Sequence, residues 1–167
     1  MKPRDGAGSQ ATRLGHLPAE SWSGPLIAQE FVDGFAASVA CLVGPAGVFP
    51  LAPCEQRLSE DGRFHYLGGR LPIEPDLAAR AAAVAVAAVA CVPGLAGYVG
   101  VDVVLGNDGR DWAIEINPRL TTSYVGLRRL AVGNLFAAML EVAGGGAPAI
   151  VWRNEAVIFC PDGEPAP

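Results

Sequence analysis

The sequence predicts an α+β domain, in which two main helices pack on a mostly antiparallel sheet. Short apolar runs alternate with tight turns, as strands of an antiparallel sheet do. The Ala- and Val-rich segment 75–92 begins at a proline and is followed by Pro-Gly, which is typical of a helix. Hydrophobic residues make up 51% of the 167 residues and charged residues 17%, enough for one buried core. We therefore expect a single domain over residues 1–167, with 161–167 as a frayed tail.

Charge and composition exclude several classes of partner. The net charge of -5 argues against nucleic acid or an anionic membrane surface as the main partner. No apolar stretch reaches the ~20 residues of a bilayer span, and the polar N-terminus does not resemble a signal peptide. The four cysteines lack C-x-x-C spacing, which argues against zinc and favours a reducing compartment. We expect a cytoplasmic protein.

The first half of the chain predicts most of the sheet. Apolar runs at 25–32, 35–43, 47–51 and 63–69 are predicted to be strands, separated by turns that contain Gly, Pro or Asp. Gln56 and Arg57 lie between two of these runs, in a polar stretch that could face a substrate but that we assign to a solvated loop.

The second half predicts a hairpin, a helix and a last hairpin. The apolar runs 99–105 and 112–116 are joined by Gly-Asn-Asp-Gly, whose residues tolerate the positive φ of tight hairpin turns. Apolar residues at helical spacing then predict one helix over 123–142, before a Gly-Gly-Gly stop. Runs 149–153 and 155–160 are predicted to form the last hairpin.

The hairpin at 99–116 carries the residues with the clearest chemistry. Glu115 and Asn117 are two residues apart and share a face of their strand. If Asp102 of the first strand faces the same side, three oxygen ligands converge, as Mg²⁺ requires. Arg119 follows at once and supplies a planar cation suited to phosphate. Each residue alone is as readily a solvated or sheet-edge charge, but carboxylates flanked by Val and Ile are costly unless they are paired or bind metal.

The N-terminus holds a second, weaker candidate site. Gly6, Gly8 and Ser9 form a small-residue loop whose backbone N–H groups could approach a phosphate, within reach of Lys2. The spacing is neither that of a P-loop nor G-x-G-x-x-G, and glycine-rich termini are more often simply mobile.

Together these stretches resemble the C-terminal half of an ATP-grasp domain, and most of all ATP-grasp ligases of the tyramine–glutamate ligase type. Four stretches carry the resemblance in the family's order: residues 2–9, 29–34, 100–102 and 115–124. They are similar to the phosphate loop, the hinge strand that meets adenine, and the two strands that bind metal.

The resemblance implies an ATP-dependent carboxylate–amine ligase, or its C-terminal catalytic fragment, that forms an amide through an acyl-phosphate. It implies Mg²⁺, with Mn²⁺ as a substitute, held by Asp102, Glu115 and Asn117. Arg119 would be the catalytic contact to the transferred phosphoryl group. The residues implied to bind ATP are Lys2, Gly6, Gly8, Ser9, Gln29, Glu30, Phe31 and Val32.

The sequence also departs from the family. After the hinge, Phe35-Ala36-Ala37 stands where relatives commonly carry a carboxylate for the ribose, and the family's N-terminal portion is absent. We therefore expect little turnover by this chain alone. A non-catalytic, truncated ATP-grasp fold that binds nucleotide or a partner is the alternative; a metal-dependent hydrolase is weaker, since no general base is evident. The expected partners are small carboxylate and amine substrates, with a homodimer or a separate N-terminal chain left open.

Overall fold

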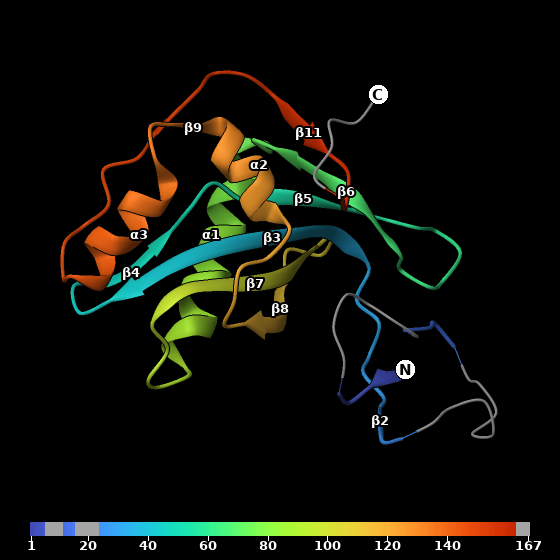
Figure 1. The fold of residues 1–167 in the computed structure, drawn as a ribbon. Helices are drawn as coiled ribbons and strands as arrows, with labels where there is room; N and C mark the ends of the chain where they lie inside the picture. The colour runs from blue at the N-terminus through green and yellow to red at the C-terminus, as the bar shows by residue number, and fades with distance from the viewer. Residues whose placement is uncertain (6–11, 16–23, 163–167) are drawn as a thin grey trace.

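The computed structural model describes residues 1–5, 12–15 and 24–162. Its main element is a seven-stranded sheet in which β4 pairs with β3 beside the path β11-β6-β5-β3-β7-β8 (Figure 1). Every pair in it is antiparallel, so the predicted fold class is confirmed. The strands are β3 (Gly34–Gly44), β4 (Gly47–Pro50), β5 (Cys54–Leu58), β6 (Tyr66–Leu71), β7 (Gly97–Gly106), β8 (Asp111–Asn117) and β11 (Val157–Phe159).

Three helices and two small sheets complete the described part of the chain. The helices are α1 (Pro75–Ala90), α2 (Ser123–Leu130) and α3 (Leu135–Ala143). The small sheets are two-stranded and antiparallel: β1 (Lys2–Pro3) with β2 (Leu26–Ile27), and β9 (Ala131–Val132) with β10 (Val151–Trp152). None of the described helices is long and apolar enough to cross a bilayer.

The helices cover the two faces of the sheet unequally. α1 packs its Ala and Val side chains on one face, against Val99, Val101 and Val103 of β7. α2 and α3 lie on the opposite face (Figure 1), where Leu127 and Leu130 join a second buried cluster. Residues alternate along β7, so Tyr98, Gly100 and Asp102 face the side of α2 and α3. The buried cluster there includes Tyr98 and excludes Asp102, which lies beyond it on the same face.

The β7–β8 hairpin forms as predicted, with one irregularity. Asp102 pairs with Glu115, but Val103 pairs with Ala113, so Ile114 is an extra residue in a β-bulge. Arg80 of α1 fixes the turn end of the hairpin, because its Nε donates to Asp111 Oδ2 at 3.0 Å and its Nη2 donates to the Gly106 carbonyl at 3.0 Å.

Several predicted elements are confirmed, and others are wrong. The strands expected at 35–43 and 47–51 and the helix at 75–92 are present as β3, β4 and α1. The strand expected at 25–32 shrinks to β2, and that expected at 63–69 begins only at Tyr66. The polar stretch assigned to a loop is β5.

The single helix expected at 123–142 is two helices. Ala131 is extended, Gly133 has a φ of 100°, and the Asn134 side chain accepts from the backbone N–H groups of Phe136 and Ala137, which starts α3 afresh. The last expected hairpin is also absent, because β10 pairs with β9 and β11 pairs with β6. Two cysteines, Cys41 and Cys54, are core residues.

Candidate functional site

A row of polar side chains crosses the sheet on the face that α2 and α3 leave partly open. Ser38 of β3 pairs with Asp102 of β7, which pairs with Glu115 of β8. Directly paired residues share a face, and Asn117 lies two residues beyond Glu115 on the same strand. The predicted placement of Asp102, Glu115 and Asn117 on one face is therefore confirmed.

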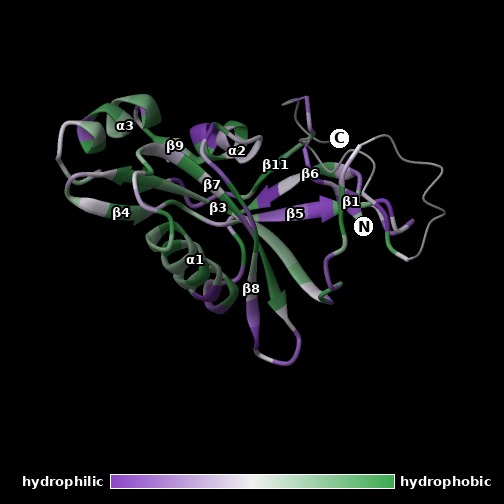
Figure 2. Ribbon diagram, turned by 90° about the horizontal axis from the view of Figure 1, so that it is seen from below, coloured by the Kyte–Doolittle hydropathy of each residue, from purple (hydrophilic) through white to green (hydrophobic). Residues whose placement is uncertain are grey.

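Three donors surround the Asp102 carboxylate. Gln56 Nε2 donates to Oδ1 at 2.8 Å, Asn117 Nδ2 donates to Oδ2 at 3.4 Å, and the Ser38 hydroxyl also hydrogen-bonds the carboxylate. The prediction that Gln56 belongs to a solvated loop is wrong, because it lies in β5 and reaches into the site. Figure 2 shows that β5 is hydrophilic, which is why the sequence did not predict a strand there.

Arg119 extends this chain of hydrogen bonds past the end of β8. Its Nη2 donates to Asn117 Oδ1 at 3.1 Å, and its Nη1 donates to the Leu120 carbonyl at 3.2 Å. A tight turn holds it there, since the Arg119 backbone N–H donates to the Asn117 carbonyl at 2.7 Å. The guanidinium thus lies beside the amide that links it to Asp102.

The electrostatics of Asp102 favour a bound cation. Burial, reinforced by the nearby charge of Glu115, raises the pKa of Asp102 from 3.8 to about 6, against the hydrogen bonds from Ser38 and Gln56 and the charge of Arg119. A cation at this point would remove that penalty.

The ligand chemistry fits a hard cation. The described residues contain no group of three or more His, Cys, Asp and Glu side chains arranged for metal. If a cation bound between the Asp102 and Glu115 carboxylates, a third oxygen would have to be the amide oxygen of Asn117, which in this structure accepts a hydrogen bond from Arg119 Nη2 at 3.1 Å. Carboxylate and amide oxygens are ligands of Mg²⁺ and Ca²⁺, and soft metals prefer other donors.

The segment after Asn117 is anchored by hydroxyl groups that the sequence did not reveal. Tyr98 OH lies 3.2 Å from Thr121 Oγ1 and 3.3 Å from Ser123 Oγ, and these two oxygens are 2.8 Å apart. Thr121 also packs over Gly100, where an added Cβ would lie 2.4 Å from Thr121 Cγ2. Gly100 therefore lets the segment that carries Arg119 lie close to β7.

The sequence profile of the ATP-grasp domain matches residues 1–123. The chain belongs to the ATP-grasp domain family. The tyramine–L-glutamate ligase of Methanocaldococcus jannaschii is 43% identical to it over 100 residues, which cover 60% of this chain and 31% of that ligase. The chain thus spans about a third of the length of this curated relative.

Solved ATP-grasp structures share the fold. An ATP-grasp superfamily protein from Archaeoglobus fulgidus is 34% identical, with a TM-score of 0.62, over 79% of this chain and 40% of that one. Biotin carboxylase from Campylobacter jejuni, in a β,γ-ATP complex, superposes with a TM-score of 0.64 at 18% identity, over 79% of this chain and 31% of that one. The second likeness shows the fold alone.

The residues predicted to bind ATP lie on other elements of this ATP-grasp chain than the Asp102 group. Lys2 is in β1, paired with Ile27, at the end of the main sheet that lies away from α3 (Figure 1). Gln29, Glu30 and Phe31 are exposed, and the Phe31 ring stacks on Phe64 with centroids 5.8 Å apart. Val32 is partly buried beside them, while Gly6, Gly8 and Ser9 lie outside the described residues.

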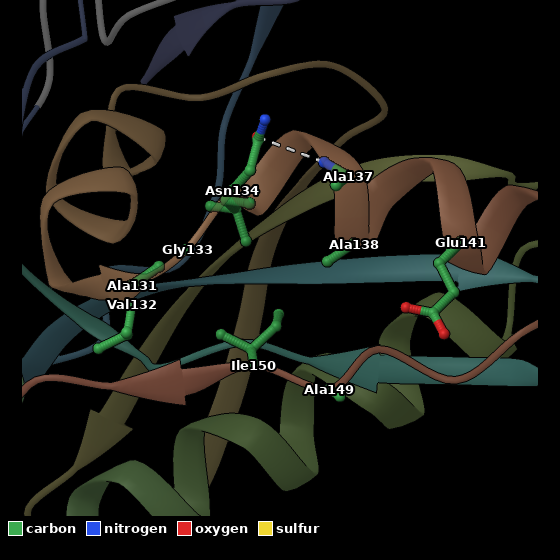
Figure 3. Close-up of a pocket in the computed structure, with 10 residues that line it drawn as sticks. Ala131, Val132, Gly133, Asn134, Ala137, Ala138, Glu141, Ala149 and Ile150 are labelled. Carbon is green, nitrogen blue, oxygen red and sulfur yellow. Dashed lines mark hydrogen bonds between the residues drawn. The ribbon is translucent and has the colours of Figure 1, made fainter.

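A pocket of about 240 Å³ lies elsewhere, between α3, β9 and residues 149–150 (Figure 3). Most of its lining residues are apolar by type, with Glu141 directed into the space and Asn134 at the start of α3. It contains none of the residues that the sequence or the hydrogen bonds assign to the ATP-grasp site.

Proposed function

We propose that this chain carries the metal-binding and phosphate-binding part of an ATP-dependent carboxylate–amine ligase. One observation supports this most directly: a continuous line of hydrogen bonds runs from Asp102 through Asn117 to Arg119, with Glu115 paired opposite Asp102. Acidic oxygens and a fixed guanidinium side by side are the arrangement that a magnesium–triphosphate needs.

Each residue has a distinct role in this proposal. Asp102, Glu115 and Asn117 hold Mg²⁺, or Mn²⁺ in its place. When bound, the metal neutralises charge on the phosphate oxygens. Arg119, which is held by Asn117, contacts the phosphoryl group during its transfer. Lys2 binds phosphate, and the backbone of residues 29–32 meets the adenine.

The proposed reaction needs no protein nucleophile. The substrate carboxylate attacks the γ-phosphorus of ATP, releasing ADP and forming an acyl-phosphate. An amine then attacks the acyl carbon, phosphate leaves, and the nitrogen loses a proton as the amide forms. Catalysis is therefore mostly positioning and charge neutralisation, which the Asp102–Arg119 line can supply. The name of the archaeal relative supports this pairing of a carboxylate with an amine.

A second candidate is a truncated ATP-grasp fold that binds a partner without catalysis. Large apolar side chains on α3 and the β9–β10 pair favour it, because they are 52–64% exposed: Val132, Phe136, Leu140 and Val151.

Titration calorimetry of the chain with ATP, with and without Mg²⁺, separates the two candidates. We expect binding that depends on Mg²⁺ and weakens at least tenfold in Asn117→Ala, since loss of one oxygen ligand removes a metal contact. Asn154→Ala, at an exposed asparagine between β10 and β11, is the matched control and keeps the affinity. Heat without Mg²⁺ dependence, or equal affinity in both variants, contradicts the metal site; absent heat with self-association favours the partner-binding module.

The ligase activity has its own assay. For the chain combined with an N-terminal ATP-grasp half, we expect ADP release that requires both a carboxylate and an amine. Arg119→Ala should lower the rate strongly, whereas Arg153→Ala, an exposed arginine near β10, should leave it unchanged. Release of phosphate without any ADP contradicts the proposed reaction.

A further inference from the structure

Gln56 reaches the candidate metal site from a strand that is not next to Asp102. β5 and β7 both pair with β3, so β3 lies between Gln56 and Asp102. Strands two places apart are separated by roughly 10 Å, yet Gln56 Nε2 is 2.8 Å from Asp102 Oδ1. The β3 residues that pair with β7 along this stretch, Ala36 and Ser38, are small and leave room above the strand.

The chemistry of Asp102 fixes which way the Gln56 amide faces. An ionised carboxylate only accepts hydrogen bonds, so the amide nitrogen has to be the group that meets it. Oδ1 of Asp102 thus accepts the hydrogen bond from Gln56 of β5. Oδ2 is left on the side of β8, where Asn117 Nδ2 lies 3.4 Å away.

We propose that Gln56 is a positioning residue for the metal site, an inference that rests on the proposed function. By binding Oδ1, it holds the Asp102 carboxylate with Oδ2 on the side of Asn117 and Glu115, the residues that would hold the proposed cation with Asp102. Glu115 lies directly opposite and its negative charge repels Asp102, so the carboxylate needs this restraint to keep one orientation. Residues that orient metal ligands in this way contribute about 10–100-fold to metal affinity.

The test compares variants of neighbouring β5 residues in the 167-residue chain. Gln56→Leu removes the donor at similar size, and Gln56→Asn keeps the amide but is one methylene too short to reach. Arg57→Leu is the matched control, because Arg57 is exposed and its side chain lies on the other face of the sheet. Mn²⁺ binding in the presence of ATP is measured by electron paramagnetic resonance, together with the melting temperature of each variant.

We expect Mn²⁺ affinity about tenfold lower in both Gln56 variants and unchanged in Arg57→Leu. The spectrum of bound Mn²⁺ should broaden in the Gln56 variants, because Asp102 then adopts more than one orientation. A merely structural role would lower the melting temperature without this spectral change.

The outcomes separate this inference from the proposed function. If the unaltered chain binds no Mn²⁺, the metal site itself is refuted. If the unaltered chain binds Mn²⁺ and the Gln56→Asn variant binds it equally well with the same spectrum, the positioning role is refuted and the metal site stands. An equal loss in Arg57→Leu also refutes the positioning role.

Discussion

Replacing Asp102 by asparagine should stabilise the metal-free protein near pH 8. The pKa of Asp102 is raised from 3.8 to about 6 by burial and by the charge of Glu115. Its contribution to stability is therefore complete below pH 3.8 and is lost as the pH rises through about 6. Asparagine has almost the same shape and no charge, so the substitution removes this loss.

The size of the effect follows from the pKa. The pKa of Asp102 changes from 3.8 to about 6, and each pKa unit corresponds to about 1.4 kcal/mol. The ionised carboxylate therefore lowers the free energy of unfolding by about 3 kcal/mol well above pH 6. The hydrogen bonds from Gln56 and Ser38 then meet a neutral oxygen, which offsets about 1 kcal/mol. The net expectation is about 2 kcal/mol more stability for Asp102→Asn near pH 8, and a difference near zero at pH 4.

Urea unfolding over this pH range, without divalent cations, measures the difference. Asp108→Asn is the control: the hydrogen bonds and charge of Arg110 hold the pKa of Asp108 below its usual value, so this variant gains nothing at high pH. Adding Mg²⁺ should stabilise the unaltered protein more than Asp102→Asn. If Asp102→Asn is no more stable near pH 8, or its advantage does not change with pH, the electrostatic account of the site is wrong.

Two further substitutions test how the site and its supporting helix are held. Gly100→Ala places a Cβ 2.4 Å from Thr121 Cγ2 and should lower the free energy of unfolding in urea by about 1–3 kcal/mol. Adding Thr121→Ser, which removes Cγ2, should regain most of this loss. If the double variant is no more stable, the strain lies elsewhere. Asn134→Ala removes the acceptor at the start of α3 and should cost about 1 kcal/mol, whereas Asn134→Asp retains the cap; equal losses in both would exclude a capping role.

The sequence predicted the elements whose signals are local. The Asn-Asp-Gly turn and the apolar runs beside it determine the β7–β8 hairpin, and the prolines around α1 mark its ends. Alternation along the strand placed Glu115 and Asn117 on one face, but it left the face of Asp102 open, and its pairing with Glu115 is known only from the structure. The predicted features depend on residues close together in the chain.

The failures have two physical causes. The first is pairing between strands that are far apart in the sequence: β10 pairs with β9, and β11 pairs with β6. No local sequence pattern predicts such pairs. β5 escaped detection because Gln56, one of its residues on the face of α2 and α3, is polar and serves Asp102 instead of the core. The polar side chain of Gln56 that hydrogen-bonds Asp102 also interrupts the apolar pattern by which a strand is predicted. The break at Ala131 was hidden because apolar residues keep their helical spacing across it.

The unpaired Ile114 shifts the register of the β7–β8 hairpin by one residue between its turn end and the end that carries Glu115. In an unbroken ladder, Trp112 would be opposite Leu105 and would point into the layer beneath α1, where Leu105 is buried. The additional residue turns Trp112 to the same side as Glu115, where it stays 42% exposed. Deleting Ile114 would restore the unbroken ladder, so either Trp112 or Glu115 would have to turn to the other face of the sheet.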